Sequence, residues 1–141
     1  MKENTYLFKR IRKKGYLMVG YTFIKALGTM TAVVLERLLT EYQHAIRHNF
    51  LCNDETFCID LEELSFHLGL SIDELVDSII KIRDLNLIYV DTYKGLYFVK
   101  INEEEIVNYE KTTEIENDYK MWDYNLYSVQ SRVDNLSNID E

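Results

Sequence analysis

The sequence predicts a mixed α+β fold that is mainly helical and contains one small β-hairpin. Three observations support this. Apolar residues recur at three- and four-residue spacing over residues 29–48, 61–68 and 72–85, which is the period of amphipathic helices. Two runs rich in β-branched and aromatic residues, 87–93 and 96–101, flank a Lys-Gly pair that is typical of a hairpin turn. With 141 residues, 47% of them hydrophobic, the chain suffices for one packed domain and a tail.

The N-terminal region is predicted to begin with a basic arm over residues 1–15. Its first 14 residues hold six basic side chains and one acidic one, a net charge of +5. Residues 16–23 are rich in aromatic and β-branched residues and indicate a short strand or an extended lead-in. Gly28 and Thr29 then supply the start and the N-cap of the first long helix. Its apolar positions are Met30, Val33, Val34, Leu38, Tyr42 and Ile46.

Strong local signals bound the next elements. A brief strand is predicted over residues 57–59, after which Asp60 caps a helix that Gly69 ends. Ser71, with Glu74 three residues later, has the capping-box pattern and begins another helix, and Asn86 suits its C-terminal end. We expect that helix to bury Ile72, Leu75, Val76, Ile79, Ile82 and Leu85. The order helix, strand, helix, turn, helix, hairpin predicts a winged helix-turn-helix domain over residues 16–107.

An acidic helical C-terminal extension is predicted over residues 108–141. Asn102 precedes three glutamates and is expected to cap a helix. Residues 101–141 hold 3 basic and 11 acidic side chains, a net charge of -8. Apolar residues then follow a 4-3 spacing, and they are the candidates for oligomerisation: Ile115, Tyr119, Trp122, Leu126, Val129, Val133 and Leu136. Three interpretations stay open: the helix packs on its own domain, pairs with a second chain as a coiled coil, or is mobile in isolation.

Several residues are candidates for contact with nucleic acid: Lys9, Arg10, Arg12, Lys13, Lys14, Ser71, Ser78, Lys81 and Lys94. The helix that would enter a DNA groove is expected to turn six residues outward: Asp73, Glu74, Asp77, Ser78, Lys81 and Asp84. Four carboxylates repel phosphate, so we favour a solvated or protein-facing surface there. For the basic arm, nucleic-acid contact, charge pairing with the acidic extension of the same or another molecule, and an inert tail stay open.

No pattern in the chain predicts catalysis, a metal or a cofactor. His44 and His48 share a helix face with Cys52 and Cys58 close behind, but they lack the glutamate of a zinc protease and the cysteine spacing of a zinc finger. Nucleophile elbows and glycine-rich phosphate loops are absent, so we expect no enzyme. No apolar run approaches the roughly 20 residues of a membrane span, and we expect a cytoplasmic protein with no membrane partner.

Five short motifs carry a family resemblance. They are Ala-Val-Val-Leu (32–35), Leu-Glu-Glu-Leu (61–64), Leu-Gly-Leu-Ser (68–71), Leu-Ile (87–88) and Lys-Ile-Asn (100–102). Over residues 17–107 the sequence resembles the N-terminal winged-helix domains of phage and plasmid replication proteins, including the DnaD-like group. The resemblance implies a role in replication initiation or helicase loading, in which such domains oligomerise or contact partner proteins.

These observations lead to one main hypothesis and two alternatives. The main hypothesis is a winged-helix protein of phage or mobile-element type that acts in DNA replication initiation or its control. It would work through protein assembly, with a protein partner or with itself, and with DNA contacted by the basic arm. The first alternative is a dimeric DNA-binding transcriptional repressor. The second is an acidic inhibitor or a pure protein-protein interaction module.

Overall fold

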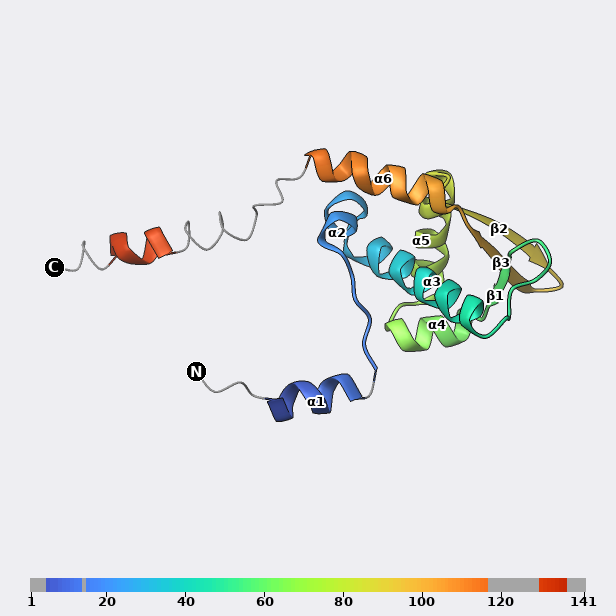
Figure 1. Cartoon of the computed structure of the whole chain (residues 1–141), viewed down its shortest axis with the longest axis horizontal. Coiled ribbons are helices and arrows are strands. Elements are labelled where there is room, and N and C mark those ends of the chain that lie inside the picture. Colours follow the sequence, from blue (N-terminus) through green and yellow to red (C-terminus); the bar gives the residue numbers. More distant parts are fainter. Residues whose placement is uncertain (1–4, 14, 117–129, 137–141) are drawn as a thin grey trace.

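The chain is mainly helical and carries a small antiparallel sheet, as the sequence predicts. The computed structural model describes residues 5–13, 15–116 and 130–136. Its helices are α1 (Thr5–Lys13), α2 (Tyr21–Leu27), α3 (Thr29–Arg47), α4 (Leu61–Leu68), α5 (Ile72–Asp84) and α6 (Glu103–Glu116). Its strands are β1 (Phe57–Ile59), β2 (Ile88–Tyr93) and β3 (Leu96–Ile101). From α3 to β3 this is the order of a winged helix-turn-helix (Figure 1).

The sheet has the order β1-β3-β2, and both neighbouring pairs are antiparallel. β2 and β3 form the predicted hairpin, which projects beyond the helices in Figure 1. Its turn residues Lys94 and Gly95 have φ values of 51° and 78°. A two-residue hairpin turn of the twist-matching type requires positive φ at both positions, which explains the glycine. β1 joins the far side of β3, with Phe57 opposite Val99.

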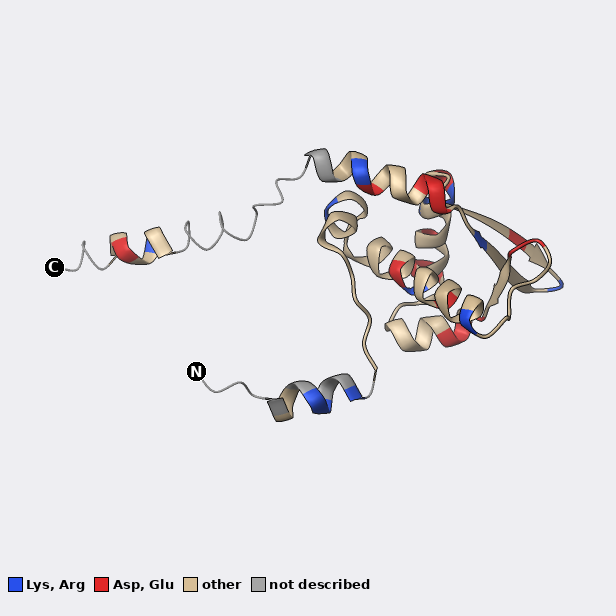
Figure 2. Cartoon of the chain, in the orientation of Figure 1, with Lys and Arg blue, Asp and Glu red and all other residues tan. Residues whose placement is uncertain are grey.

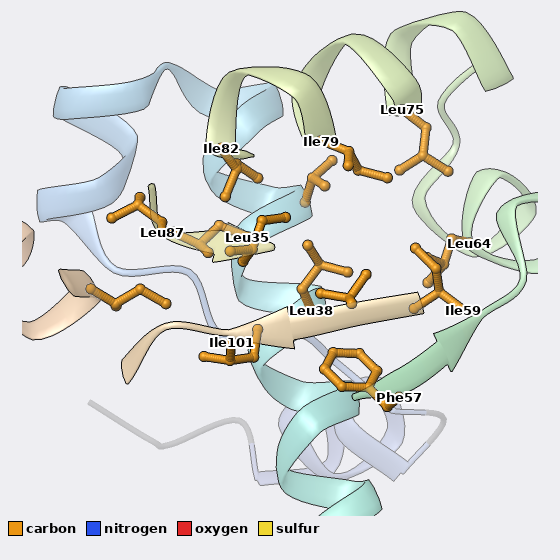
Figure 3. Close-up of a cluster of buried hydrophobic side chains, with 14 of the residues drawn as sticks. Leu35, Leu38, Phe57, Ile59, Leu64, Leu75, Ile79, Ile82, Leu87 and Ile101 are labelled. Carbon is orange, nitrogen blue, oxygen red and sulfur yellow. The ribbon is translucent and has the colours of Figure 1, made fainter. Parts of the chain in front are cut away.

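The core lies between the sheet and the helices α3, α4 and α5 (Figure 3). Leu35 and Leu38 project from α3 toward Ile79 and Ile82 of α5, and all four are buried. The strands close this core from the other side with buried apolar residues, namely Phe57, Ile59, Ile88, Val99 and Ile101. Burial of apolar side chains is the main stabilising term for such a fold.

The helix pair α4–α5 is bounded by the predicted caps. The carboxylate of Asp60 accepts hydrogen bonds from the backbone N–H groups of Glu62 and Glu63 at 3.0 and 3.2 Å. Gly69 ends α4 with φ 67°, in the left-handed region that glycine adopts at least cost. Ser71 and Glu74 then form the reciprocal capping box of α5. The tight turn between the two helices is therefore built from local hydrogen bonds.

The N-terminal part of the domain differs from the prediction. Residues 16–20 are extended, but Tyr21–Leu27 form the helix α2 instead of a strand. A helix buries Phe23 and lets Ile24 and Leu27 pack on the core, which outweighs the β-rich composition. Thr29 is also not an N-cap: Gly28, with φ 85°, takes that position without a side-chain hydrogen bond. Gly28 also ends α2, so one residue joins the two helices.

The buried faces of α3 and α5 are shifted from the predicted ones. Ile72 of α5 and Leu85, the C-cap residue that follows the helix, are exposed, whereas Ser78 is buried with only 2% of its surface accessible. Ser78 follows Leu75 by three residues, which places it on the face that packs against α3, and a small side chain fits this close contact. In α3, Met30 and Ile46 are likewise exposed.

The helix α6 begins on the domain and continues past the predicted domain boundary at residues 107–108. Ile106 is buried and Tyr109 packs against the core, and α6 also contacts α2. Asn102 does precede the helix, and its Nδ2 donates a hydrogen bond to the carbonyl of Asn86 at 2.9 Å. The described helices include none long and apolar enough to span a membrane.

Candidate functional site

The helix α5 stands where a winged helix-turn-helix would present side chains to DNA, and the capping box holds its first turn. The backbone N–H of Glu74 donates to Ser71 Oγ at 3.1 Å, and the backbone N–H of Ser71 donates to Glu74 Oε1 at 3.0 Å. The hydroxyl of Ser71, one of the predicted nucleic-acid candidates, therefore already accepts a hydrogen bond within the helix start. This hydrogen bond stabilises the N-terminal end of α5.

The exposed surface of α5 is acidic, as the sequence predicts. Asp73, Glu74, Asp77 and Asp84 are exposed, and Lys81 is exposed among them. Arg83 adds a second cation, but its guanidinium lies 3.2 Å from the carboxylate of Asp84. Ser78 was predicted to face outward and to be a nucleic-acid candidate. The predicted orientation is wrong, because its side chain is buried with only 2% of its surface accessible, so Ser78 is not on the surface that could meet nucleic acid. A surface with this charge repels a phosphate backbone.

The wing supplies little positive charge at its tip. Lys94 is exposed, and its Nζ lies 5.2 Å from the centre of the Tyr93 ring, a cation–π contact. Asp91 lies on the same hairpin, and its carboxylate accepts a hydrogen bond from the backbone N–H of Thr92 at 2.9 Å. Lys81 on α5 and Lys94 on the wing are thus each accompanied by carboxylates of their own element.

The basic residues of the N-terminal arm lie on a helix, which was not predicted from the sequence. In α1, Lys9, Arg10 and Lys13 are exposed. Figure 2 shows these blue residues apart from the winged-helix body, where acidic residues prevail on α4, on the start of α6 and beside the sheet. The candidate Lys14 and the side chain of Arg12 lie outside the described residues. α1 is therefore the strongest local concentration of positive charge that the structure describes.

Most of the predicted oligomerisation seam, which is the set of apolar residues at 4-3 spacing from Ile115 to Leu136, falls beyond the part of the chain that the structure describes. Tyr119, Trp122, Leu126 and Val129 lie outside the described residues, as does the side chain of Ile115. Residues 130–136 are helical, and the last two members of the seam, Val133 and Leu136, are exposed there. Packing of this seam on the domain or on another chain stays a prediction.

The two histidines near the end of α3 make ring contacts with each other and with Phe50, and the two cysteines that follow take no part in them. The ring centres of His44 and His48 are 4.4 Å apart, and His48 stacks on Phe50 at 5.7 Å. Cys52 and Cys58 are free and exposed. Over the described residues, no group of three or more His, Cys, Asp or Glu side chains is placed to hold a metal ion.

Among the residues that the structure describes, two open grooves lie beside helices. One, of about 740 Å³, runs along α3 and is lined by Tyr16, Met18, Glu36, Leu39, Thr40, Tyr42, Gln43, Ile46 and Arg47. Burial raises the pKa of the Glu36 carboxyl, and a backbone hydrogen bond from Gly20 opposes this shift. The other, of about 280 Å³, lies between α5 and the hairpin, with Val76, Ile80 and Tyr97 among its lining residues. Neither groove joins an acid, a base and a nucleophile into a catalytic arrangement.

One surface of the molecule was not predicted from the sequence. Tyr89 and Tyr93 of β2 and Leu96 of β3 are exposed large side chains on the hairpin. The signal that would have found them is the alternation of the strands, because every second residue of a strand points to the same face. In this sequence the alternation is hard to recognise, because both faces of these strands carry apolar or aromatic residues.

Comparison of the chain with family models, with curated proteins and with solved structures found no match in any of the three. Function is therefore inferred from the fold, from the charge of α5 and α1, and from the exposed surfaces described above.

Proposed function

We propose that the chain is a non-catalytic winged-helix assembly module of phage or mobile-element type, which acts in the cytoplasm in DNA replication initiation or its control. It works through protein contacts made by the winged-helix body, while the basic helix α1 contacts the DNA backbone. The resemblance of residues 17–107 to the winged-helix domains of phage and plasmid replication proteins supports this choice of process.

The acidic surface of α5 carries the proposal. A winged helix that reads a DNA groove places hydrogen-bond donors against phosphates and base edges. The helix α5 instead exposes Asp73, Glu74 and Asp77 within its first two turns. Because each carboxylate is repelled by phosphate, this surface suits a protein partner or solvent better than a DNA groove.

The charge of α1 supports DNA contact at a second place. Lys9, Arg10 and Lys13 are exposed within two turns of one helix, and none of the ion pairs found among the described residues involves them. Cations of this kind bind phosphate backbones without regard to sequence and steer association over distance. DNA binding is therefore expected to be weak, independent of sequence and sensitive to salt.

The test measures binding of the full chain to a labelled DNA duplex at several salt concentrations. A variant with K9E, R10E and K13E is compared with a control that carries K25E, K81E and K94E, so both have the same net charge. We expect the α1 variant to lose binding and the control to keep most of it. A plot of the logarithm of the binding constant against the logarithm of salt concentration has a negative slope. For each phosphate that a variant no longer neutralises, the magnitude of this slope should fall by about 0.9.

Two results would contradict the assignment of DNA contact to α1. If the control loses binding while the α1 variant keeps it, α5 and the wing contact DNA, as in a dimeric repressor. If the full chain binds no DNA even at low salt, the α1 part of the proposal is wrong and the chain is a pure protein-interaction module.

A further inference from the structure

One face of the sheet is uncovered by helices and rich in aromatic side chains. Alternation along the strands places Ile88, Val90 and Val99 toward the core and the residues between them on the opposite face. We call this opposite face the outer sheet face; its residues are Cys58, Tyr89, Asp91, Tyr93, Leu96, Phe98 and Lys100. Tyr89 is 56% exposed and Tyr93 61% exposed. Exposed aromatic side chains gathered on one surface are typical of an interaction site.

The strand register gives the outer sheet face a particular symmetry. Tyr89 lies opposite Lys100, and Asp91 lies opposite Phe98. Tyr89 and Asp91 are two residues apart on β2, as are Phe98 and Lys100 on β3, so the four residues occupy the corners of a rectangle. The aromatic residues Tyr89 and Phe98 lie on one diagonal. The charged residues Asp91 and Lys100 lie on the other.

We propose that the outer sheet face is a homodimer interface, in which two copies pack face to face about a two-fold axis along the Tyr89–Phe98 diagonal. Rotation about that axis brings each end of the charged diagonal close to the position of the other end, within reach of a lysine side chain. Lys100 of one copy therefore lies over Asp91 of the other, and the reverse pair forms at the same time. Tyr89 and Phe98 each meet their own counterparts near the axis, where aromatic rings contribute most to binding.

Charge balance favours a second copy over other occupants. The chain has a net charge of -8, yet the outer sheet face holds one lysine and one aspartate. The face itself is therefore neutral. No salt bridge within the described residues engages Lys100 or Asp91, although the charge of Lys100 acts on Asp54, in the loop before β1, and helps to lower the pKa of that carboxyl. Single-stranded nucleic acid also stacks on aromatic sheet faces, but such platforms lie in positively charged grooves. This face has no excess of positive charge.

This inference rests on the proposed assembly function and names one partner, a second copy of the chain. Its test uses the full chain and two charge variants, D91K and K100D, with the mass in solution measured by analytical ultracentrifugation. Wild type is expected to form a dimer. In either variant alone, like charges face one another across the axis, and we expect association at least about tenfold weaker.

Mixing the two variants gives the decisive result. In a mixed pair the D91K chain offers lysines at both charged corners and the K100D chain offers aspartates, so both cross-interface pairs form again. We expect the mixture to restore the dimer at the wild-type concentration range, and the double variant D91K/K100D to restore it within a single chain. Restoration also shows that the variants fold, since a misfolded chain would not recover its partner.

A cross-link supplies a second measurement. Cys58 lies opposite Phe98 in the register, close to the proposed axis, and it is exposed. Packed sheets lie about 10 Å apart, so a bismaleimide of similar length should join Cys58 of one copy to Cys58 of the other. The C52S chain is expected to form a covalent dimer, and the C58S chain, which keeps Cys52, is the matched control without one.

Several outcomes would overturn the inference. They are a monomeric wild type at all concentrations, dimers of D91K and K100D as strong as wild type, or no recovery on mixing. Binding of a single-stranded oligonucleotide that depends on Tyr89 and Phe98, with no dimer, would assign the face to nucleic acid instead. A failed dimer with DNA binding through α1 intact leaves the proposed function standing, because the two experiments change different residues.

Discussion

Tyr42 and Glu103 join α3 to the first turn of α6. The hydroxyl of Tyr42 donates a hydrogen bond to Glu103 Oε1 at 2.7 Å, although the two residues are far apart in the sequence. This hydrogen bond, with burial and the negative charges of Glu103 and Glu55, raises the pKa of Tyr42 from 10.0 to about 12. The neutral tyrosine is therefore the form that ties α6 to the domain.

The Y42F substitution should remove this tie at small cost to packing. We expect the free energy of unfolding near neutral pH to fall by about 0.5–1 kcal/mol, a modest figure because the bond is partly exposed to water. A group whose pKa is higher in the folded than in the unfolded state contributes its full stabilisation of the folded state at pH values below the unfolded pKa. That contribution is lost as the pH rises through the folded pKa. The difference between wild type and Y42F, measured by urea unfolding, should therefore shrink between pH 10 and about 12. A difference that grows in this range would contradict the assignment.

At the residue level, the acidic charge of the exposed surface of α5 was predictable from the sequence. Which residues border that surface was not. Helical spacing placed Asp73, Asp77 and Lys81 outside, and they are exposed. The same spacing leaves residues at the border of a face undecided, and Ser78 is such a residue. A small polar side chain gives no hydropathy signal, so only the packed structure shows that it is buried.

The helix α5 depends on its N-terminal cap as an element. Its buried residues Leu75, Ile79 and Ile82 reach the core only if the helix begins at the right residue and at the right angle. The reciprocal hydrogen bonds between Ser71 and Glu74 satisfy two backbone N–H groups at that point.

We expect S71A to lower the free energy of unfolding by about 1 kcal/mol, because a backbone N–H of the first turn then loses its acceptor. S71T is the matched control: it keeps the hydroxyl and should lose less than half as much. Urea unfolding followed by circular dichroism measures both. If S71A were as stable as wild type, the hydroxyl would not be a structural cap, and a role in contacting a ligand would become the better explanation for it.

Elements with local signals were predicted well, and elements formed by tertiary contact were not. The caps at Asp60 and Ser71 and the turn at Gly95 act within a few residues, so the sequence alone indicates where α4, α5 and the hairpin begin or end. The helix α2 has no such signal, because it forms where Phe23 meets the core. The outer sheet face needed the register of β2 and β3, which only pairing in space defines.

For the molecule as a whole, positive charge and packed core occupy different parts of the chain. The described core begins at Phe23, with Val19 as the first residue that packs on it. The exposed cations of α1 precede both. Any function of α1 is therefore separable from folding of the winged-helix body.

A chain that begins at residue 15 should accordingly keep its free energy of unfolding within about 0.5 kcal/mol of the full chain. It should nevertheless lose the DNA binding that we attribute to α1. F23A in the full chain is the opposite control: loss of a buried aromatic side chain should cost about 3 kcal/mol or more while α1 stays in place. Thermal or urea unfolding of the three chains decides this. A large loss of stability on removing residues 1–14 would show that α1 belongs to the folded body.

The pairing of β1 with β3 has a consequence for synthesis on the ribosome. Phe57 pairs with Val99, so β1 leaves the ribosome well before β3, its neighbour in the sheet, has been made. During that interval, which is set by the rate of synthesis, the apolar residues Phe57 and Ile59 have no strand beside them. The nascent chain should therefore be most prone to misassociation after α4 has emerged and before the wing is complete.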